Sequence, residues 1–436
     1  MKGLRETLAS LSALRGRFKD LLASAEARQG PSTSSAAPND LRQRDDFGSN
    51  PGKLRMLFHV PQNLPKGRPL VVALHGCTQT AAVYDYGSGW STLADREGFA
   101  VLYPEQQRAN NPNTCLNWFV PSDTRRDQGE ALSISQMIER MIQDHGVDRS
   151  KVFIVGLSAG GAMTAAMLAA YPDVFAGGAI IAGLPHGAAT NMQEAFEAMA
   201  GRRIQSAEQW GDVVRAASSH RGPWPRLSVW HGSADTIVNP QNMESILQQW
   251  TQVHRTSVSP HLEHDLQGHK RRAWRSDDGV EVIEAMSVAG MPHGVPLATT
   301  GVEGIGHAGP YHFDVGISST QHIAKFWGLA ATTARKARPQ PQPDAHAARS
   351  VQPEPADAAP QLAARSVIPY VHQPDDDASP SQGANPTADG RLDPQAVIAA
   401  ALKAAGLLGP PTDNPLDPRR VVTSTLRAVG VLKDGR

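Results

Sequence analysis

The sequence lacks paired cysteine motifs, net charge and long apolar runs, and each absence excludes a class of protein. Its 436 residues contain two cysteines, Cys77 and Cys115, and neither lies in a C-x-x-C pair. Because the histidines also show no ligand spacing, we expect no metal site. The 42 Lys and Arg residues balance the 42 Asp and Glu residues. This balance argues against nucleic acid or an anionic membrane as the partner.

No apolar run is long enough to span a bilayer. Residues 1–28 carry charges throughout and lack the uninterrupted apolar core of a secretory signal peptide. Their apolar residues recur at helical spacing, at Leu4, Leu8, Leu11, Leu14, Phe18, Leu21 and Leu22. We therefore predict an amphipathic N-terminal helix that packs on protein or a partner, or anchors to a surface.

Composition separates the rest of the chain into four segments. Residues 29–49 are rich in Pro, Ser, Ala, Asn and Asp, which predicts a flexible linker. Residues 50–330 alternate strand-like and helix-like patterns, which predicts a catalytic α/β domain. Residues 331–390 are rich in Pro and Ala and contain little that could build a core, so we expect a disordered linker.

The last segment, residues 391–436, is an internal repeat. The tripeptide Leu392-Asp393-Pro394 recurs as Leu416-Asp417-Pro418. Each copy places Asp at a helix N-cap, Pro at the first helical position and Gly at the end, so we predict two short helices. The repeat either docks on a partner or a polymer surface, or forms a solvated tail.

Short apolar segments alternate with helical ones within residues 50–330. This alternation is typical of a mostly parallel sheet covered on both faces, with ligands at the carboxyl ends of the strands. We expect strands near 54–60, 70–74, 99–103, 152–155, 177–182, 227–231 and 281–288, with an extra pair near 261–276. We expect helices near 88–97, 130–144, 158–170, 206–217, 239–254 and 318–327.

The most informative stretch is Gly156-Leu157-Ser158-Ala159-Gly160. It follows an apolar run over 152–155 and precedes a run of small residues over 161–170. This order predicts strand, sharp turn and helix, the nucleophile elbow of the α/β-hydrolases, and makes Ser158 the predicted nucleophile. The alternative is a glycine-rich turn whose serine only caps a helix.

A serine nucleophile needs a histidine base and a carboxylate, which follow it in this fold in the order acid, then His. Asp235 follows the strand expected at 227–231, so we predict it as the acid; alternatively, it only caps a turn. Two histidines lie in glycine-rich loops. We favour His293, which directly follows the last strong strand, over His307, which lies in the loop before the final helix.

An oxyanion hole needs two backbone N–H groups. One is expected from Ala159, just after the nucleophile, and the second from Cys77, in the loop after the strand at 70–74. Cys77 itself is a poor candidate nucleophile, because no His or acid follows in its motif. Cys77 and Cys115 both fall near the predicted site, so a disulfide and two buried thiols are both open interpretations.

Four blocks of sequence carry a resemblance to a known family. They are Leu74-His75-Gly76-Cys77-Thr78-Gln79-Thr80, Tyr103-Pro104-Glu105-Gln106, Cys115-Leu116-Asn117-Trp118-Phe119 and Gly156-Leu157-Ser158-Ala159-Gly160-Gly161-Ala162-Met163. Together they resemble the polyhydroxybutyrate (PHB) depolymerase family of esterases over roughly residues 50–330. The resemblance implies an α/β-hydrolase with a Ser-Asp-His triad, acting on short-chain polyesters or their oligomers. It supports His293, because Ala289-Gly290-Met291-Pro292-His293-Gly294 resembles the histidine loop of the family.

Trp118 lies near the oxyanion loop in such proteins, which makes it a candidate substrate contact; the alternative is a core aromatic. The insert at 184–226, with Trp210 and Trp224, is predicted to cap the site. The family is typically extracellular, yet the sequence shows no recognisable signal peptide, so a cytoplasmic location and non-classical export both stay open.

We therefore predict a serine esterase that needs no cofactor and acts on polyesters. Feruloyl and acetylxylan esterases share similar motifs, so ester hydrolysis on plant-wall polymers is the first alternative. A non-catalytic protein that binds polymer granules is the second, with the N-terminal helix or the C-terminal repeat as its contact.

Overall fold

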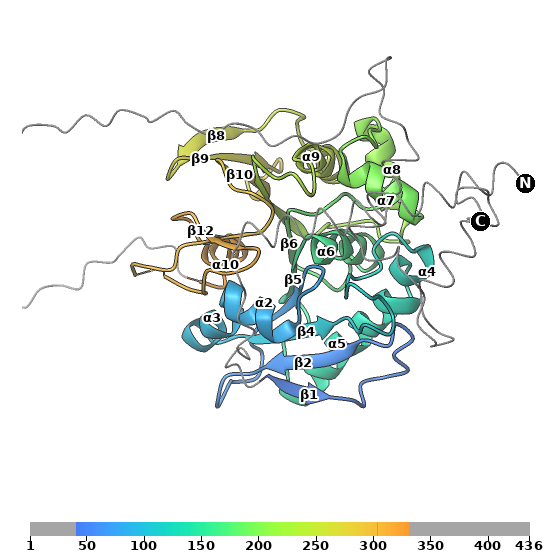
Figure 1. Cartoon of the computed structure of the whole chain (residues 1–436), viewed down its shortest axis with the longest axis vertical. Coiled ribbons are helices and arrows are strands. Elements are labelled where there is room, and N and C mark those ends of the chain that lie inside the picture. The colour runs from blue at the N-terminus through green and yellow to red at the C-terminus, as the bar shows by residue number, and fades with distance from the viewer. Residues whose placement is uncertain (1–40, 303, 331–436) are drawn as a thin grey trace, which may run out of the picture. The chain divides into compact units, whose positions relative to one another are not determined.

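A ten-stranded sheet organises the part of the chain that the computed structural model describes, residues 41–302 and 304–330 (Figure 1). Its strands are β1 (Arg42–Arg44), β2 (Arg55–His59), β3 (Leu70–Leu74), β4 (Ala100–Glu105), β5 (Val152–Leu157), β6 (Gly177–Ile181), β7 (Arg226–Gly232), β8 (Leu262–Leu266), β9 (His269–Arg275) and β10 (Glu281–Val288). They lie in the order β1-β2-β4-β3-β5-β6-β7-β10-β9-β8. The strands from β4 to β10 in this order pair in parallel, and antiparallel strands extend both edges.

Helices cover both faces of the sheet, as expected for parallel strands joined by crossovers. They are α2 (Ala81–Ser88), α3 (Trp90–Glu97), α4 (Pro121–Thr124), α5 (Gly129–His145), α6 (Ala159–Ala170), α7 (Met192–Met199), α8 (Ala207–Ala216), α9 (Gln241–His254) and α10 (Ser319–Trp327). Buried residues of α5, α6, α8 and α9 join the core on one face, and those of α2, α3 and α10 join the core on the other. A short parallel pair, β11 (Val295–Leu297) and β12 (His312–Asp314), lies apart from the main sheet.

The strand β3 shows how the sequence fills both cores. Leu70, Val72 and Leu74 belong to one core, whereas Val71 and Ala73 belong to the other. All five side chains are at most 1% exposed. A continuous apolar run is therefore required here, because successive side chains of a strand point to opposite faces and both faces are covered.

The sheet begins earlier than the sequence suggested. Residues 42–44 lie within the predicted linker at 29–49, yet they form β1 and pair with β2. Besides the four-residue α4, two helices were also missed, α2 and α7. The first is short and contains Gly87, which packs against the imidazole of His312 too closely for a Cβ atom. Both helices begin at a polar cap, since the side chains of Thr80 and Asn191 accept hydrogen bonds from backbone N–H groups of the first turn.

Three predicted segments lie outside the described residues: the N-terminal helix at 1–28, the linker at 331–390 and the repeat at 391–436. Within residues 41–302 and 304–330, no helix is both long enough and apolar enough to cross a bilayer.

Candidate active site

Ser158 occupies a sharp turn between β5 and α6. Its backbone has φ 58° and ψ −116°, a conformation that residues other than glycine rarely adopt. The turn is possible because two flanking residues lack a side chain. A Cβ atom at Gly156 would lie 2.2 Å from the carbonyl oxygen of Gly160, and one at Gly160 would lie 2.4 Å from that of Leu74. The strand-turn-helix geometry expected for the elbow is therefore present.

Asp235 lies in the loop after β7, and its carboxylate is buried and held by hydrogen bonds. The Oδ1 atom accepts hydrogen bonds from the backbone N–H groups of Ile237 and Val238, each at 2.9 Å. The Oδ2 atom lies 2.7 Å from Nδ1 of His293. Because an ionised carboxylate can only accept, Nδ1 of His293 carries the proton and Nε2 is left as the basic nitrogen.

The surroundings of Asp235 favour its ionised form. Burial alone would raise the pKa of this carboxyl, but the charge of His293 and the hydrogen bonds from His231 and His293 outweigh burial. The pKa of Asp235 is therefore well below its usual value. An acid that stays ionised can fix the orientation of an imidazole and stabilise its charged form.

The loops that carry Asp235 and His293 are joined to each other. Ala234 donates its backbone N–H to the carbonyl of Met291 at 3.1 Å, and Gly290 donates to the hydroxyl of Ser233 at 2.9 Å. A Cβ atom at Gly232 would lie 2.1 Å from the carbonyl oxygen of Met291. The close approach of the two loops brings the acid and the imidazole within hydrogen-bonding distance.

His307, the other candidate base, lies elsewhere. Its imidazole stacks on the ring of Tyr86 at a centroid distance of 3.9 Å, and its Nδ1 lies 3.0 Å from the carbonyl oxygen of Tyr86. The side chain is exposed and does not line the cavity that Ser158 and His293 share. Among the two candidates, only His293 is paired with a carboxylate beside Ser158.

The two predicted oxyanion donors both border the same cavity. Cys77 lies in the loop after β3, and Ala159 is the first residue of α6. Neither backbone N–H donates a hydrogen bond to another group in the described ranges. The loop of Cys77 is held in place, because Thr78 donates its backbone N–H to the carbonyl of Asn113 at 2.7 Å and Gly76 donates to the side chain of Gln79 at 2.9 Å.

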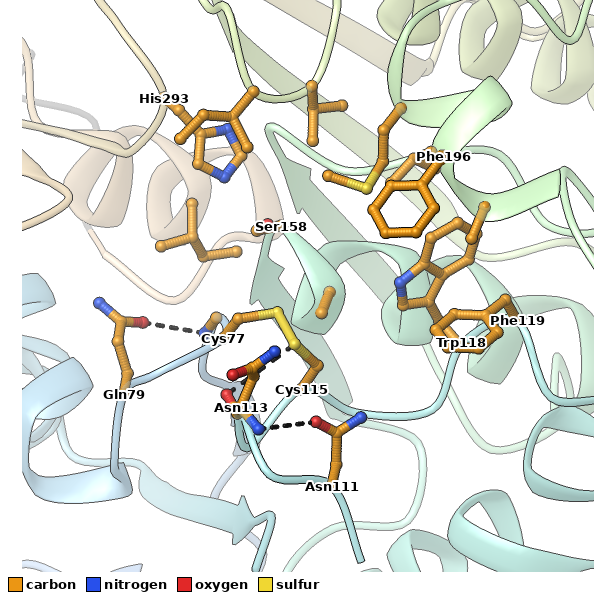
Figure 2. Close-up of a pocket in the computed structure, with 18 of the residues that line it drawn as sticks. Cys77, Gln79, Asn111, Asn113, Cys115, Trp118, Phe119, Ser158, Phe196 and His293 are labelled. Atoms are coloured by element: carbon orange, nitrogen blue, oxygen red, sulfur yellow. Dashed lines mark hydrogen bonds between the residues drawn. A yellow bond between two sulfur atoms is a disulfide. The ribbon is translucent and has the colours of Figure 1, made fainter. Parts of the chain in front are cut away.

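Cys77 and Cys115 form a disulfide, which settles the two readings left open by the sequence. The bond joins the loop after β3 to the segment that contains Trp118 (Figure 2). A buried glutamate supports the same segment: Glu130 accepts a hydrogen bond from the backbone N–H of Asn117 at 2.8 Å and another from Gln106. Burial raises the pKa of Glu130 to about 8. No sequence pattern indicated this role for Glu130.

A cavity of about 460 Å³ contains the serine and the histidine (Figure 2). Its apolar wall comes from α7, through Met192, Ala195, Phe196 and Met199, and from the aromatic pair Trp118 and Phe119. Besides Ser158 and His293, its polar lining includes the amides Gln79, Asn111 and Asn113. None of the described residues that line it is Asp, Glu, Lys or Arg. The cavity suits a ligand that is uncharged and partly aliphatic.

The predicted cap at 184–226 contributes to the cavity through Leu184 and α7 and not through its tryptophans. Trp210 is fully buried in a small core with Leu184 and Val238. Trp224 packs edge-on against Trp250. Trp118, by contrast, does line the cavity. In the described part of the chain, no group of three or more His, Cys, Asp or Glu residues is arranged to hold a metal ion.

Comparisons with known proteins agree with this geometry. Residues 56–257 match the family described as esterase PHB depolymerase. The chain is 45% identical over 298 residues to poly(3-hydroxyalkanoate) depolymerase C of Paucimonas lemoignei, covering 68% of this chain and 72% of that protein. It is 35% identical over 283 residues to an acetylxylan esterase of Coprinopsis cinerea, covering 63% and 74%.

A solved structure gives the same relationship. The acetyl xylan esterase from Aspergillus awamori superimposes with a TM-score of 0.57 at 27% identity, covering 67% of this chain and all of that one. The fold is therefore that of an α/β-hydrolase, as predicted. The chain belongs to the PHB depolymerase family of esterases, which are carboxylic ester hydrolases.

Proposed function

We propose that the chain is a serine esterase in which Ser158, His293 and Asp235 form the catalytic triad. The observation that carries the proposal is the 2.7 Å pairing of His293 with the buried Asp235 beside a serine on a strained elbow. A hydroxyl in this setting becomes nucleophilic when the free imidazole nitrogen removes its proton. Residues 50–330 would form the catalytic domain, extended at its start by β1.

In the proposed reaction, the Oγ atom of Ser158 attacks the ester carbonyl carbon while its proton passes to Nε2 of His293. The backbone N–H groups of Cys77 and Ala159 stabilise the negative oxygen of the tetrahedral intermediate. His293 then protonates the leaving alcohol, which leaves an acyl group on Ser158. A water molecule, deprotonated by His293, attacks this acyl-enzyme and releases the acid. Asp235 orients His293 and stabilises its charged form, and no cofactor takes part.

The substrate class that we favour is a short-chain polyester or its oligomers. A polyester offers carbonyl acceptors and aliphatic segments but no charge, and the cavity offers amide donors, apolar surface and no charged side chain. The similarity to a poly(3-hydroxyalkanoate) depolymerase supports this choice. Acetylxylan esterase activity is the second candidate, favoured by the similarity to fungal acetylxylan esterases. Trp118, on the apolar wall, is the proposed substrate contact.

The test of the triad is the hydrolysis of p-nitrophenyl butyrate by the wild type and by Ser158→Ala. We expect the variant to lose roughly 10⁴- to 10⁶-fold in kcat, because the nucleophile is absent. A fluorophosphonate probe should label the wild type at Ser158 and leave the variant unlabelled. Equal rates for the two proteins would refute catalysis and favour the non-catalytic, granule-binding alternative.

The test of the substrate is a comparison of 3-hydroxybutyrate oligomers, acetylated xylan and feruloyl esters at equal enzyme concentration. We expect the oligomers to give the highest kcat/KM. Trp118→Ala should lower kcat/KM for the oligomers about 10-fold while changing p-nitrophenyl acetate hydrolysis little, and Trp118→Phe should retain most activity. Faster release of acetate from xylan would reject the polyester assignment and leave the triad in place.

A granule or partner contact through residues 1–28 or 391–436 stays a prediction from the sequence. It is testable by assays on polymer granules with the intact chain, with a chain that begins at residue 41 and with a chain that ends at residue 330.

A further inference from the structure

A second histidine contacts the carboxylate of Asp235. His231 lies in β7, four positions before Asp235, and is 1% exposed. Its Nε2 atom lies 2.9 Å from the carbonyl oxygen of Val238 and 3.2 Å from Oδ2 of Asp235. The reaction as proposed above gives His231 no task, although it touches the same carboxylate oxygen as His293.

The contact with Val238 determines which nitrogen of His231 carries the proton. A backbone carbonyl can only accept a hydrogen bond, so a nitrogen 2.9 Å from it must be an N–H donor. The same N–H lies within reach of Asp235, so it is shared between the carbonyl and the carboxylate. The other ring nitrogen, Nδ1, is buried and has no hydrogen-bond partner in the described ranges. The contacts therefore favour the neutral ring with its proton on Nε2.

We propose that His231 is a positioning residue that acts through Asp235, an inference that rests on the proposed triad. Its N–H gives Oδ2 a second donor at 3.2 Å, so that each oxygen of the carboxylate has two donors within 3.2 Å. Oδ1 is held by Ile237 and Val238, and Oδ2 by His231 and His293. With all four in place, the carboxylate cannot rotate away from His293 without breaking a hydrogen bond in a buried site.

The position of His231 in the fold makes it a rigid support. It belongs to a strand in the interior of the sheet and pairs in register with Ser287 of β10, the strand that leads into the loop of His293. The donor is therefore fixed to the two strands that deliver the acid and the base. An ordinary core residue at this position would fill the same space but would leave Oδ2 with His293 alone.

The first experiment compares His231→Leu, which removes the donor, with His231→Gln, whose amide nitrogen can reach the place of Nε2. For p-nitrophenyl butyrate, we expect kcat to fall about 10- to 100-fold in the Leu variant with KM nearly unchanged. The Gln variant should recover to within about 3-fold of the wild type. Equal losses in the two variants, or losses that follow the melting temperature, would mean that His231 only fills space.

A double-mutant cycle tests whether the effect passes through Asp235. In an Asp235→Asn background, His231→Leu should cost less than about 3-fold, because the carboxylate that it positions is already absent. The same 10- to 100-fold loss in both backgrounds would overturn the proposal. Losses of activity in Ser158→Ala and His293→Ala test the triad separately, so failure of the cycle would remove only the role of His231.

The first of two further measurements does not depend on the folding of a Leu variant. NMR of the wild-type chain with ¹⁵N-labelled histidine should show His231 protonated at Nε2, and protonation at Nδ1 would overturn the assignment. The second measurement is the dependence of kcat/KM on pH. Its acidic limb should be unchanged in His231→Gln and should move to higher pH in His231→Leu. The shift is expected because Asp235, having lost one donor, attracts the proton of His293 more strongly. An unmoved limb in the Leu variant would contradict the proposal.

Discussion

Two loops of this protein each carry a histidine among glycines, and only one of them forms part of the candidate site. His293 is 6% exposed and pairs with Asp235, whereas His307 is exposed and stacks on Tyr86. The difference does not lie in the local sequence, because both loops place the histidine next to glycine. It lies in what each loop packs against: the loop after β7 in one case and α2 in the other.

A histidine becomes a candidate base when another strand delivers a carboxylate to it. β7 and β10 are neighbours in the sheet and run in parallel, so the loops at their carboxyl ends meet. Asp235 and His293 lie on those two loops. The loop of His307 follows the small β11 strand and has no such neighbour with an acid among the described contacts of His307.

The largest expected effect comes from exchanging the two histidines for alanine in turn. His293→Ala should lower kcat/KM for p-nitrophenyl butyrate by roughly 10⁴-fold or more, because the proton of Ser158 then has no acceptor. His307→Ala should stay within about 2-fold of the wild type. Steady-state kinetics of both purified variants check this pair, and circular dichroism verifies that each is folded. A larger loss in His307→Ala than in His293→Ala would reverse the assignment of the base.

A smaller effect is expected from the glycines of the same two loops. A Cβ atom at Gly294 would lie 2.6 Å from both the Phe313 ring and the carbonyl oxygen of Tyr311, whereas one at Gly309 would meet no atom within 4 Å. Gly294→Ala should therefore move the backbone next to His293, lowering stability by about 1–3 kcal/mol and kcat by about 10-fold or more.

Gly309→Ala is the matched control, because the same methyl group enters open space in the loop of His307. We expect its stability to change by less than about 0.5 kcal/mol and its activity to be unaffected. Denaturant melts and kinetics of the two variants make the comparison. Full activity in Gly294→Ala would show that activity tolerates a displacement of His293. That result would contradict the tight coupling of the two loops.

Much of the fold could be predicted because its signals are local. β3 and β5 are continuous apolar runs, which only a strand covered on both faces requires. The elbow was equally clear, since Gly156 and Gly160 are fixed by contacts with backbone only a few residues away or in the neighbouring strand. β1 was missed because its sequence, Arg-Gln-Arg, carries no apolar pattern and its strand character comes from pairing with β2.

The helix α7, which supplies part of the apolar wall, was also missed, although its signal was present. Its apolar residues recur at helical spacing, a pattern that usually indicates a helix packed on the core. Here the shared face lines the cavity, through Met192, Ala195, Phe196 and Met199. His231 had no comparable signal. Its contact with Asp235 depends on how the chain turns after β7, which no pattern of residue types specifies. Candidate residues specified by chain order could thus be predicted, whereas the contacts of His231 and of α7 depend on how the loops pack.

The smallest expected effect is a pH dependence of the stability of the fold. The buried carboxylate of Asp235 should contribute to it, whereas an exposed surface carboxylate should not. The pKa of Asp235 is held below its usual value in the folded state, mainly by His293 and His231 acting against burial. A carboxyl whose pKa is lower in the folded than in the unfolded state stabilises the fold above its unfolded pKa of about 4. That stabilisation is lost as the pH falls through the folded value.

Asp235→Asn should therefore be less stable than the wild type by about 2 kcal/mol at pH 6, and the gap should narrow below about pH 4. The control is Asp212→Asn on α8, where the carboxylate is 73% exposed and, among the described residues, pairs only with Arg215, so the gap should be small at every pH. Urea melts of the three proteins between pH 3 and pH 7, roughly the range over which carboxyl groups titrate, supply the measurement. Comparing differences removes the contribution of all other carboxyl groups, which the three proteins share. A gap for Asp235→Asn that stays constant with pH would mean that the carboxylate and its histidines are not coupled in the folded state.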